Sequence, residues 1–109
     1  MGRFVIVAFK PKPGQSEALA ALVAKHLHVL RAQNLVTDKA PYVMQAADDT
    51  VVEVFEWRSI EAISAAHKNP AVQALWREFA AVCDYVPLAS LTEAQQMFAE
   101  FDADRKSVV

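Results

Sequence analysis

The chain has 109 residues, 54% of them hydrophobic, a formal net charge of −2 and a single cysteine. This length is typical of one domain with its own core. The dispersed lysines and arginines form no cationic stripe of the kind that nucleic-acid binding requires, and no apolar run approaches the ~20 residues of a membrane span. We therefore expect no nucleic-acid and no membrane partner.

The lone Cys83 excludes an intrachain disulfide and favours a reducing, cytoplasmic location. We expect no signal peptide, because an apolar strand-like run begins at Phe4.

The N-terminal third predicts a strand followed by a helix. Residues 4–9 are apolar and rich in β-branched side chains, and Pro11 and Pro13 end the strand because proline cannot continue a central ladder. Ser16 is the predicted N-cap of a helix that runs to about residue 33, where Asn34 suits a left-handed backbone. His26 falls near the centre of the apolar stripe of this helix, formed by Leu19, Leu22, Val23, Leu27 and Leu30.

The middle of the chain predicts a hairpin and a divided helix. Residues 42–47 and 50–57 are two short strands joined by a tight turn at Asp48-Asp49. Ser59 caps a helix that ends near His67, and Asn69 then caps a second segment with Pro70 at its first position. This segment extends to about residue 82 and carries an apolar stripe of Val72, Leu75, Trp76, Phe79, Val82 and Cys83.

The C-terminal part predicts a last strand over residues 85–91 and a last helix over 92–101. Thr92 and Gln95 have the spacing of a capping box, and residues 102–109 are expected to fray. The order strand, helix, strand, strand, helix, strand predicts one ferredoxin-like α+β domain over residues 1–109, with a four-stranded antiparallel sheet and both helices on one face. A second copy could cover the other face, so we expect a homodimer.

The stretch EWRSIEAISAAHKNPAVQALW, residues 56–76, resembles the antibiotic biosynthesis monooxygenase (ABM) family of dimeric α+β barrels. The resemblance rests on Trp57, Ser59, Glu61-Ala62, His67 and Pro70, and on FVIVAFKPKPG as the opening strand and turn. Many relatives carry the histidine nine residues after the tryptophan, where this chain has Ala66. The resemblance implies a pocket between helices and sheet for a flat aromatic or quinol-like molecule. Several members oxygenate such substrates with molecular oxygen and no metal or flavin, others degrade haem, and some isomerise small molecules.

His67 is the first candidate catalytic residue. It shares a predicted helix face with Ile60 and Ile63, and an imidazole can remove a phenolic proton at neutral pH. The alternative is a histidine that caps helix carbonyls beside the break at Pro70.

Glu53 is the second candidate. It shares one face of its strand with Val51, Phe55 and Trp57, where a carboxylate could act as general base or proton shuttle. The alternative is an interior or interface glutamate paired with an arginine or lysine of a partner subunit.

The predicted substrate pocket is formed by Trp57, Ile63, His26, Trp76 and Phe79. The alternative for His26 is a hydrogen-bonded core residue, which is the more frequent role of a histidine inside an apolar stripe. No HxxxH motif or carboxylate cluster accompanies the histidines, so we expect no metal site. The resemblance to the ABM family implies that no cofactor is needed. The leading hypothesis is cofactor-independent oxygenation of a flat aromatic substrate. The alternatives are a dimeric ligand-binding barrel without catalysis and a cofactor-free isomerase of a small carbonyl compound.

Overall fold

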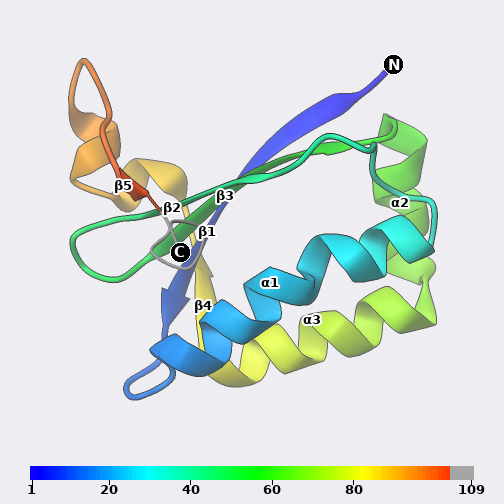
Figure 1. Ribbon diagram of the computed structural model, residues 1–109, viewed down its shortest axis with the longest axis horizontal. Helices are drawn as coiled ribbons and strands as arrows, with labels where there is room; N and C mark the ends of the chain where they lie inside the picture. The colour runs from blue at the N-terminus through cyan, green and yellow to red at the C-terminus, as the bar shows by residue number, and fades with distance from the viewer. Residues whose placement is uncertain (104–109) are drawn as a thin grey trace.

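The computed structural model describes residues 1–103, and their sheet has the predicted ferredoxin-like topology. Its strands are β1 (Arg3–Pro11), β2 (Tyr42–Gln45), β3 (Val51–Trp57), β4 (Cys83–Val86) and β5 (Asp102–Ala103). They are antiparallel in the order β4-β1-β3-β2-β5, so a fifth, two-residue strand extends the expected four. Helices α1 (Ser16–Ala32) and α3 (Pro70–Val82) lie side by side across one face, and α2 (Ile60–Lys68) precedes α3 (Figure 1). The predicted α+β fold class is confirmed.

Helix α1 buries the predicted stripe, including His26. Its first residue is Ser16, but the N-cap is Gln15 and makes no side-chain capping hydrogen bond, so the predicted cap was one residue late. The chain reaches this cap through a tight turn in which Gln15 N–H donates to the Lys12 carbonyl (2.9 Å). Asn34 has a φ of 60°, which confirms the left-handed backbone expected after the helix.

The break between α2 and α3 has the predicted caps. Ser59 Oγ accepts a hydrogen bond from Ala62 N–H (3.1 Å), and Asn69 Oδ1 accepts from Ala71 N–H (2.9 Å). Pro70 occupies the first position of α3, where no N–H is needed.

The packing face predicted for α2 is wrong. Its buried residues are Ala62 and Ala66, whereas Ile60 is 56% exposed and His67 is exposed. Alanines at i and i+4 let the helix lie close to the core cluster that contains Trp57, and this turns the larger side chains outward. Ala66, where many ABM relatives carry a histidine, is fully buried.

The C-terminal segment contains no helix over residues 92–101. Strand β4 ends at Val86, and two short 3₁₀ turns follow, η1 (Leu88–Ser90) and η2 (Glu93–Gln95). The capping-box pattern failed because Thr92 makes no side-chain cap; the Glu93 carboxylate instead accepts from Ala47 N–H of the β2–β3 hairpin (2.8 Å). Of the predicted frayed tail, residues 102–103 pair with β2, and residues 104–109 lie outside the described residues.

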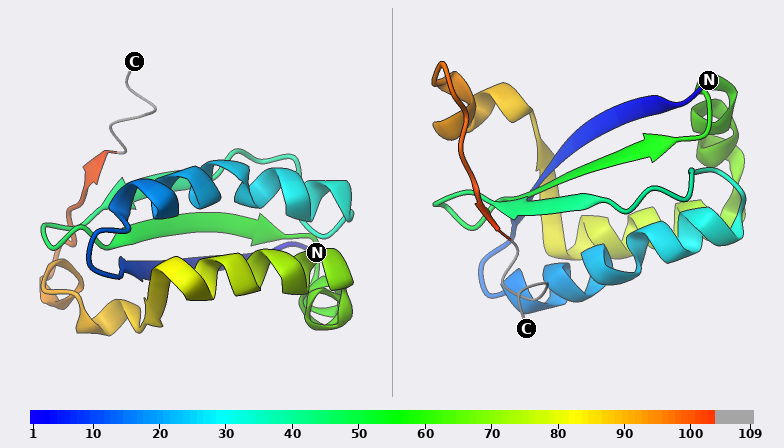
Figure 2. Two further views of the ribbon diagram at one scale, coloured as in Figure 1. Left: turned by 90° about the horizontal axis from the view of Figure 1, so that it is seen from below. Right: turned by 45° about the horizontal axis from the view of Figure 1, so that its top comes forward.

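The two faces of the sheet are covered differently. Both long helices lie on one side, and the C-terminal segment lies at the end of the sheet away from α2 (Figure 2). There Leu91 is buried with Ala8, Ala46 and Val52. The remainder of this open face exposes large side chains: Phe4 (60%), Ile6 (49%) and Tyr42 (73%). None of the described helices is long and apolar enough to cross a membrane.

Candidate functional site

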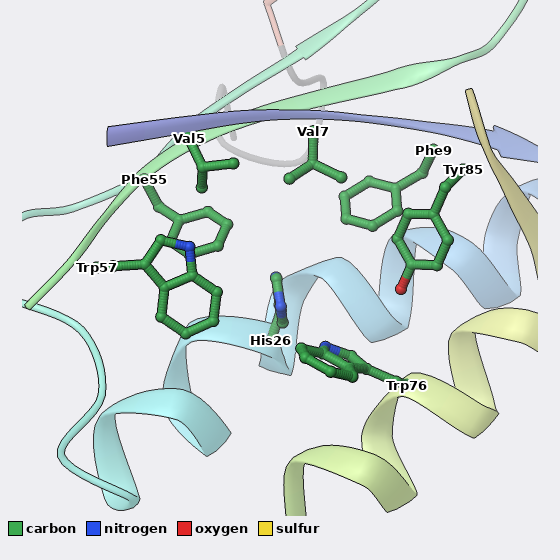
Figure 3. Close-up of a pocket in the computed structure, with 8 residues that line it drawn as sticks. All are labelled: Val5, Val7, Phe9, His26, Phe55, Trp57, Trp76 and Tyr85. Atoms are coloured by element: carbon green, nitrogen blue, oxygen red, sulfur yellow. The ribbon is translucent and has the colours of Figure 1, made fainter. Parts of the chain in front are cut away.

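A cavity of about 330 Å³ lies between the sheet and the helices α1 and α3 (Figure 3). This volume is at the lower end of the ~300–1,000 Å³ range of small-molecule sites. The lining side chains come from three strands and two helices: Val5, Val7, Phe9, His26, Phe55, Trp57, Trp76 and Tyr85.

The sheet register explains why distant parts of the chain meet here. Successive strand residues point to opposite faces, so alternate residues of β1 and β3 face the helices together. Val5 pairs with Phe55, and Phe9 pairs with Tyr85 of β4. The register therefore places strand residues more than 70 positions apart in sequence on one wall.

A buried histidine–carboxylate pair forms the polar part of this site. His26 Nδ1 lies 2.7 Å from Glu53 Oε1, and the two residues are only 4% and 0% exposed. With Glu53 as a carboxylate and His26 neutral, Nδ1 donates the shared proton and Nε2 keeps its lone pair. Nε2 has no hydrogen-bond partner among the residues that the structure describes, and His26 lines the cavity. The arrangement gives one oriented base in an apolar site.

Aromatic rings hold the His26 imidazole in place. It makes edge-on contacts with Phe55 (centroids 5.3 Å apart, interplanar angle 83°) and Phe79 (5.2 Å, 69°). Phe9 makes a longer contact of the same kind (6.2 Å, 85°). Packing and the bond to Glu53 thus fix the position and the orientation of the ring.

Tyr85 supplies a second polar group at the cavity. Its ring is tilted against Phe9 (centroids 5.5 Å apart), and its hydroxyl points into the cavity toward Trp76 (Figure 3). Partial burial, with a smaller contribution from the charge of Cys83, raises the pKa of Tyr85 to about 12. The phenol therefore stays protonated at neutral pH and can donate a hydrogen bond.

The structure brings together four of the predicted site residues: His26, Glu53, Trp57 and Trp76. His67 lies outside the cavity on the exposed side of α2, where its ring contacts Trp76 edge-on (5.1 Å, 64°).

The other two predicted residues support the cavity without lining it. Ile63 is half-buried and packs against the core cluster that contains Trp57. Phe79 is fully buried and stacks on Phe9 (4.9 Å, 17°).

The pairing of His26 with Glu53 accounts for the buried carboxylate within a single subunit. The alternative of a partner's arginine or lysine is not needed for Oε1, whereas Oε2 has no partner among the described residues. No group of three or more histidine, cysteine or acidic side chains within residues 1–103 is placed to hold a metal ion.

Cys83 is a poor candidate for chemistry. It is 2% exposed, and its Sγ–H donates to the Phe79 carbonyl (3.2 Å). Burial, and to a lesser extent the Asp84 charge, raises its pKa to about 11. The thiol is a buried core group, as its sequence context indicates.

Sequence reasoning missed most of the strand side of the cavity: Val5, Val7, Phe9, Phe55 and Tyr85. The alternation in residues 4–9 could have identified Val5, Val7 and Phe9 as one face. Tyr85 could be found only from the β1–β4 register, because nothing in its local sequence marks a site.

No protein-family model matches the chain, and a search of curated proteins finds no significant match. Solved structures do match. Rv0793 from Mycobacterium tuberculosis has 20% identity and a TM-score of 0.63, over 79% of this chain and 89% of that one. A protein from Chloroflexus aurantiacus J-10-fl, described as a "putative Antibiotic biosynthesis monooxygenase", has 20% identity and a TM-score of 0.58, over 81% and 94%. NE2512 from Nitrosomonas europaea, of unknown function, has 22% identity and a TM-score of 0.56, over 78% and 86%.

The chain has the fold of these proteins. The likeness extends over nearly the whole of each neighbour, so it concerns a complete domain. At about one identical residue in five, it establishes the fold alone, and activity must be argued from the site.

Proposed function

We propose that the chain is an ABM-like enzyme that oxygenates a flat aromatic or quinol-like substrate without a cofactor. The observation that carries this proposal is the buried His26–Glu53 pair facing an aromatic cavity. The fold likeness to the Chloroflexus protein, together with the ABM-like residues 56–76, supports the family assignment.

In this mechanism His26 Nε2 is the general base. A flat substrate lies between the rings of Trp57 and Trp76 and presents an acidic O–H or C–H to Nε2. Once the proton has moved, the imidazolium is stabilised by the Glu53 carboxylate 2.7 Å from Nδ1. The apolar walls exclude water from the resulting carbanion or phenolate.

Dioxygen is the oxidant, and the substrate supplies both electron pairs that the reaction needs. The deprotonated carbon forms a C–O bond to dioxygen, and the peroxide anion recovers a proton from the imidazolium. Loss of water from the hydroperoxide converts the original CH₂ into C=O, so one oxygen atom enters the product and one leaves as water. No external reductant is required.

Oxygen uptake with anthrone and dihydroquinones tests the proposal. His26→Asn is the informative variant, because its amide N–H₂ can still donate to Glu53 while the Nε2 base is lost. His28→Ala is the matched control, since His28 lies on the same helix but is exposed. We expect uptake by wild type and His28→Ala, with a loss of about 10²-fold or more in His26→Asn. Full uptake by a folded His26→Asn would overturn the proposal.

Proton-transfer isomerisation is a second candidate, because the same pair can move a proton without oxygen. Turnover of a carbonyl substrate under nitrogen, lost in His26→Asn, would favour it. Ligand binding with neither oxygen uptake nor proton exchange would favour the non-catalytic barrel.

We also propose that a second copy covers the exposed part of the open sheet face. Phe4, Ile6 and Tyr42 there expose large apolar surfaces to solvent, and contiguous exposed apolar surface typically marks an interface. A molar mass of about 24 kDa by light scattering, twice the chain mass of 12.0 kDa, is the expected result.

A further inference from the structure

Two polar side chains of opposite hydrogen-bonding character face the cavity. In the neutral form that donates Nδ1–H to Glu53, His26 offers a lone pair at Nε2. Tyr85 offers an O–H group directed into the same space (Figure 3). Both rings pack against Phe9, at centroid distances of 6.2 and 5.5 Å. One ligand of two or three fused rings could therefore meet an acceptor and a donor at once.

The donor has no competing partner within the protein. Tyr85 Oη makes no hydrogen bond to any residue in the described part of the chain. Its ring is held by Phe9, and the pairing of Phe9 with Tyr85 in the β1–β4 ladder fixes its backbone. Tyr85 lies on the edge strand β4 and is 52% exposed, and it lines the cavity from that edge. A donor at this position can stabilise developing charge on a substrate oxygen.

We propose that the Tyr85 hydroxyl donates a hydrogen bond to a carbonyl oxygen of an uncharged substrate. This inference rests on the proposed function for the role of His26. No lysine or arginine is among the residues that line the cavity, so the lining offers no cation to compensate the charge of an anionic substrate.

Tyr85 acts during proton abstraction. As the C–H proton moves to His26 Nε2, the electron pair of that bond delocalises through the ring onto the carbonyl oxygen, which becomes an enolate oxygen. The Tyr85 O–H donates to this oxygen without giving up its proton. The raised pKa of Tyr85, about 12, keeps the hydroxyl in its donor form.

Ligand-binding measurements distinguish the contribution of the Tyr85 hydrogen bond from that of the aromatic side chains that line the cavity. 9-Fluorenone and fluorene have nearly the same shape, and only fluorenone carries a carbonyl. Their dissociation constants are measured by quenching of Trp57 and Trp76 fluorescence in wild type and in Tyr85→Phe. Tyr42→Phe is the matched control, because the only other tyrosine lies 73% exposed on the open sheet face.

We expect wild type to prefer fluorenone, and Tyr85→Phe to lose about two- to tenfold in fluorenone affinity with fluorene unchanged. Equal losses of affinity for both ligands would show that Tyr85 contributes only apolar contact, which would overturn the inference. A fluorenone preference that survives in Tyr85→Phe would also overturn it, since the donor would then be an indole N–H. Failure of wild type to bind either ligand would overturn it as well.

Exchange of the anthrone methylene protons for deuterium, followed by NMR under nitrogen, adds the catalytic readout. We expect a fall of about 10²-fold in Tyr85→Phe and no change in Tyr42→Phe. The proposed role of Tyr85 would be refuted if the exchange rate were unchanged in Tyr85→Phe while wild type takes up oxygen. The oxygenase proposal would then still hold. A fluorenone preference that is present in wild type and lost in Tyr85→Phe, in a protein without oxygen uptake, would overturn the oxygenase proposal and leave the role of Tyr85 standing.

Discussion

Replacing both members of the His26–Glu53 pair by leucine should leave the fold intact and abolish oxygen uptake. The pair occupies two positions that otherwise belong to apolar stripes, one on α1 and one on β3. Burying a charged or polar pair removes both groups from water, and that desolvation is often larger than the attraction recovered between them. The double variant His26→Leu/Glu53→Leu exchanges the pair for hydrophobic contacts.

The single variants should each be worse than the double. His26→Leu leaves Glu53, 0% exposed, with neither carboxylate oxygen bonded, because Oε2 already has no partner among the described residues. An uncompensated buried charge of this kind costs about 3–5 kcal/mol. Glu53→Leu leaves only the imidazole Nδ1–H unsatisfied, which costs about 1–3 kcal/mol. The double variant should be neutral or more stable than wild type by up to about 4 kcal/mol.

Urea unfolding followed by tryptophan fluorescence measures all four free energies of unfolding. Against a total of about 5–15 kcal/mol for a domain of this size, these differences are large and easily resolved. A double variant less stable than both single variants would refute the reasoning, because the pair would then be a structural support. A stable double variant without activity would show that the pair is kept for chemistry at the expense of stability.

Three further outcomes follow from the structure. His67→Ala should retain oxygen uptake within about twofold, because the His67 ring lies outside the cavity. A loss of tenfold or more in the same assay would instead identify His67 as the general base. The folded chain raises the pKa of Cys83 from 9.0 to about 11, so its thiolate fraction at pH 8 is lowered about a hundredfold. Iodoacetamide labelling of Cys83 should therefore be slow until urea is added. Because the unfolded thiol ionises first, the free energy of unfolding should fall as the pH rises from 9 through 11. Ile6→Lys places a charge on the exposed sheet face and should shift the molar mass in light scattering from dimer to monomer with an unchanged circular dichroism spectrum, whereas a persistent dimer would locate the interface elsewhere.

The two periodicities of the sequence identify the members of the buried His26–Glu53 pair separately. The 3.6-residue period places His26 in the buried stripe of α1, and the two-residue period places Glu53 on the face of β3 that carries Phe55 and Trp57. Neither pattern shows that the two side chains meet, because they are 27 residues apart and their contact depends on how α1 crosses the sheet. The contact between Nδ1 and Oε1 is a property of the tertiary fold.

Local rules failed where tertiary contacts compete with them. Hydrophobicity favours burial of Ile60, but close approach of α2 to the core favours the alanines at 62 and 66. The capping-box spacing after residue 91 predicts a helix, but the buried Leu91 and the bond from Ala47 N–H to Glu93 hold that segment in short turns. In both cases the decisive partner lies in another part of the chain.

Side-chain size explains why the cavity lies under β1 and not at the helix break. At the break, the buried Ala62 and Ala66 allow α2 to pack closely against the core cluster that contains Trp57. Along β1, the short side chains of Val5 and Val7 face the helices between larger aromatic rings and leave a space above His26. A ligand that reaches Nε2 must therefore lie against these two valines. In the proposed function, the residues that limit ligand size are then on the first strand, and the polar groups that face the ligand are those of His26 and Tyr85.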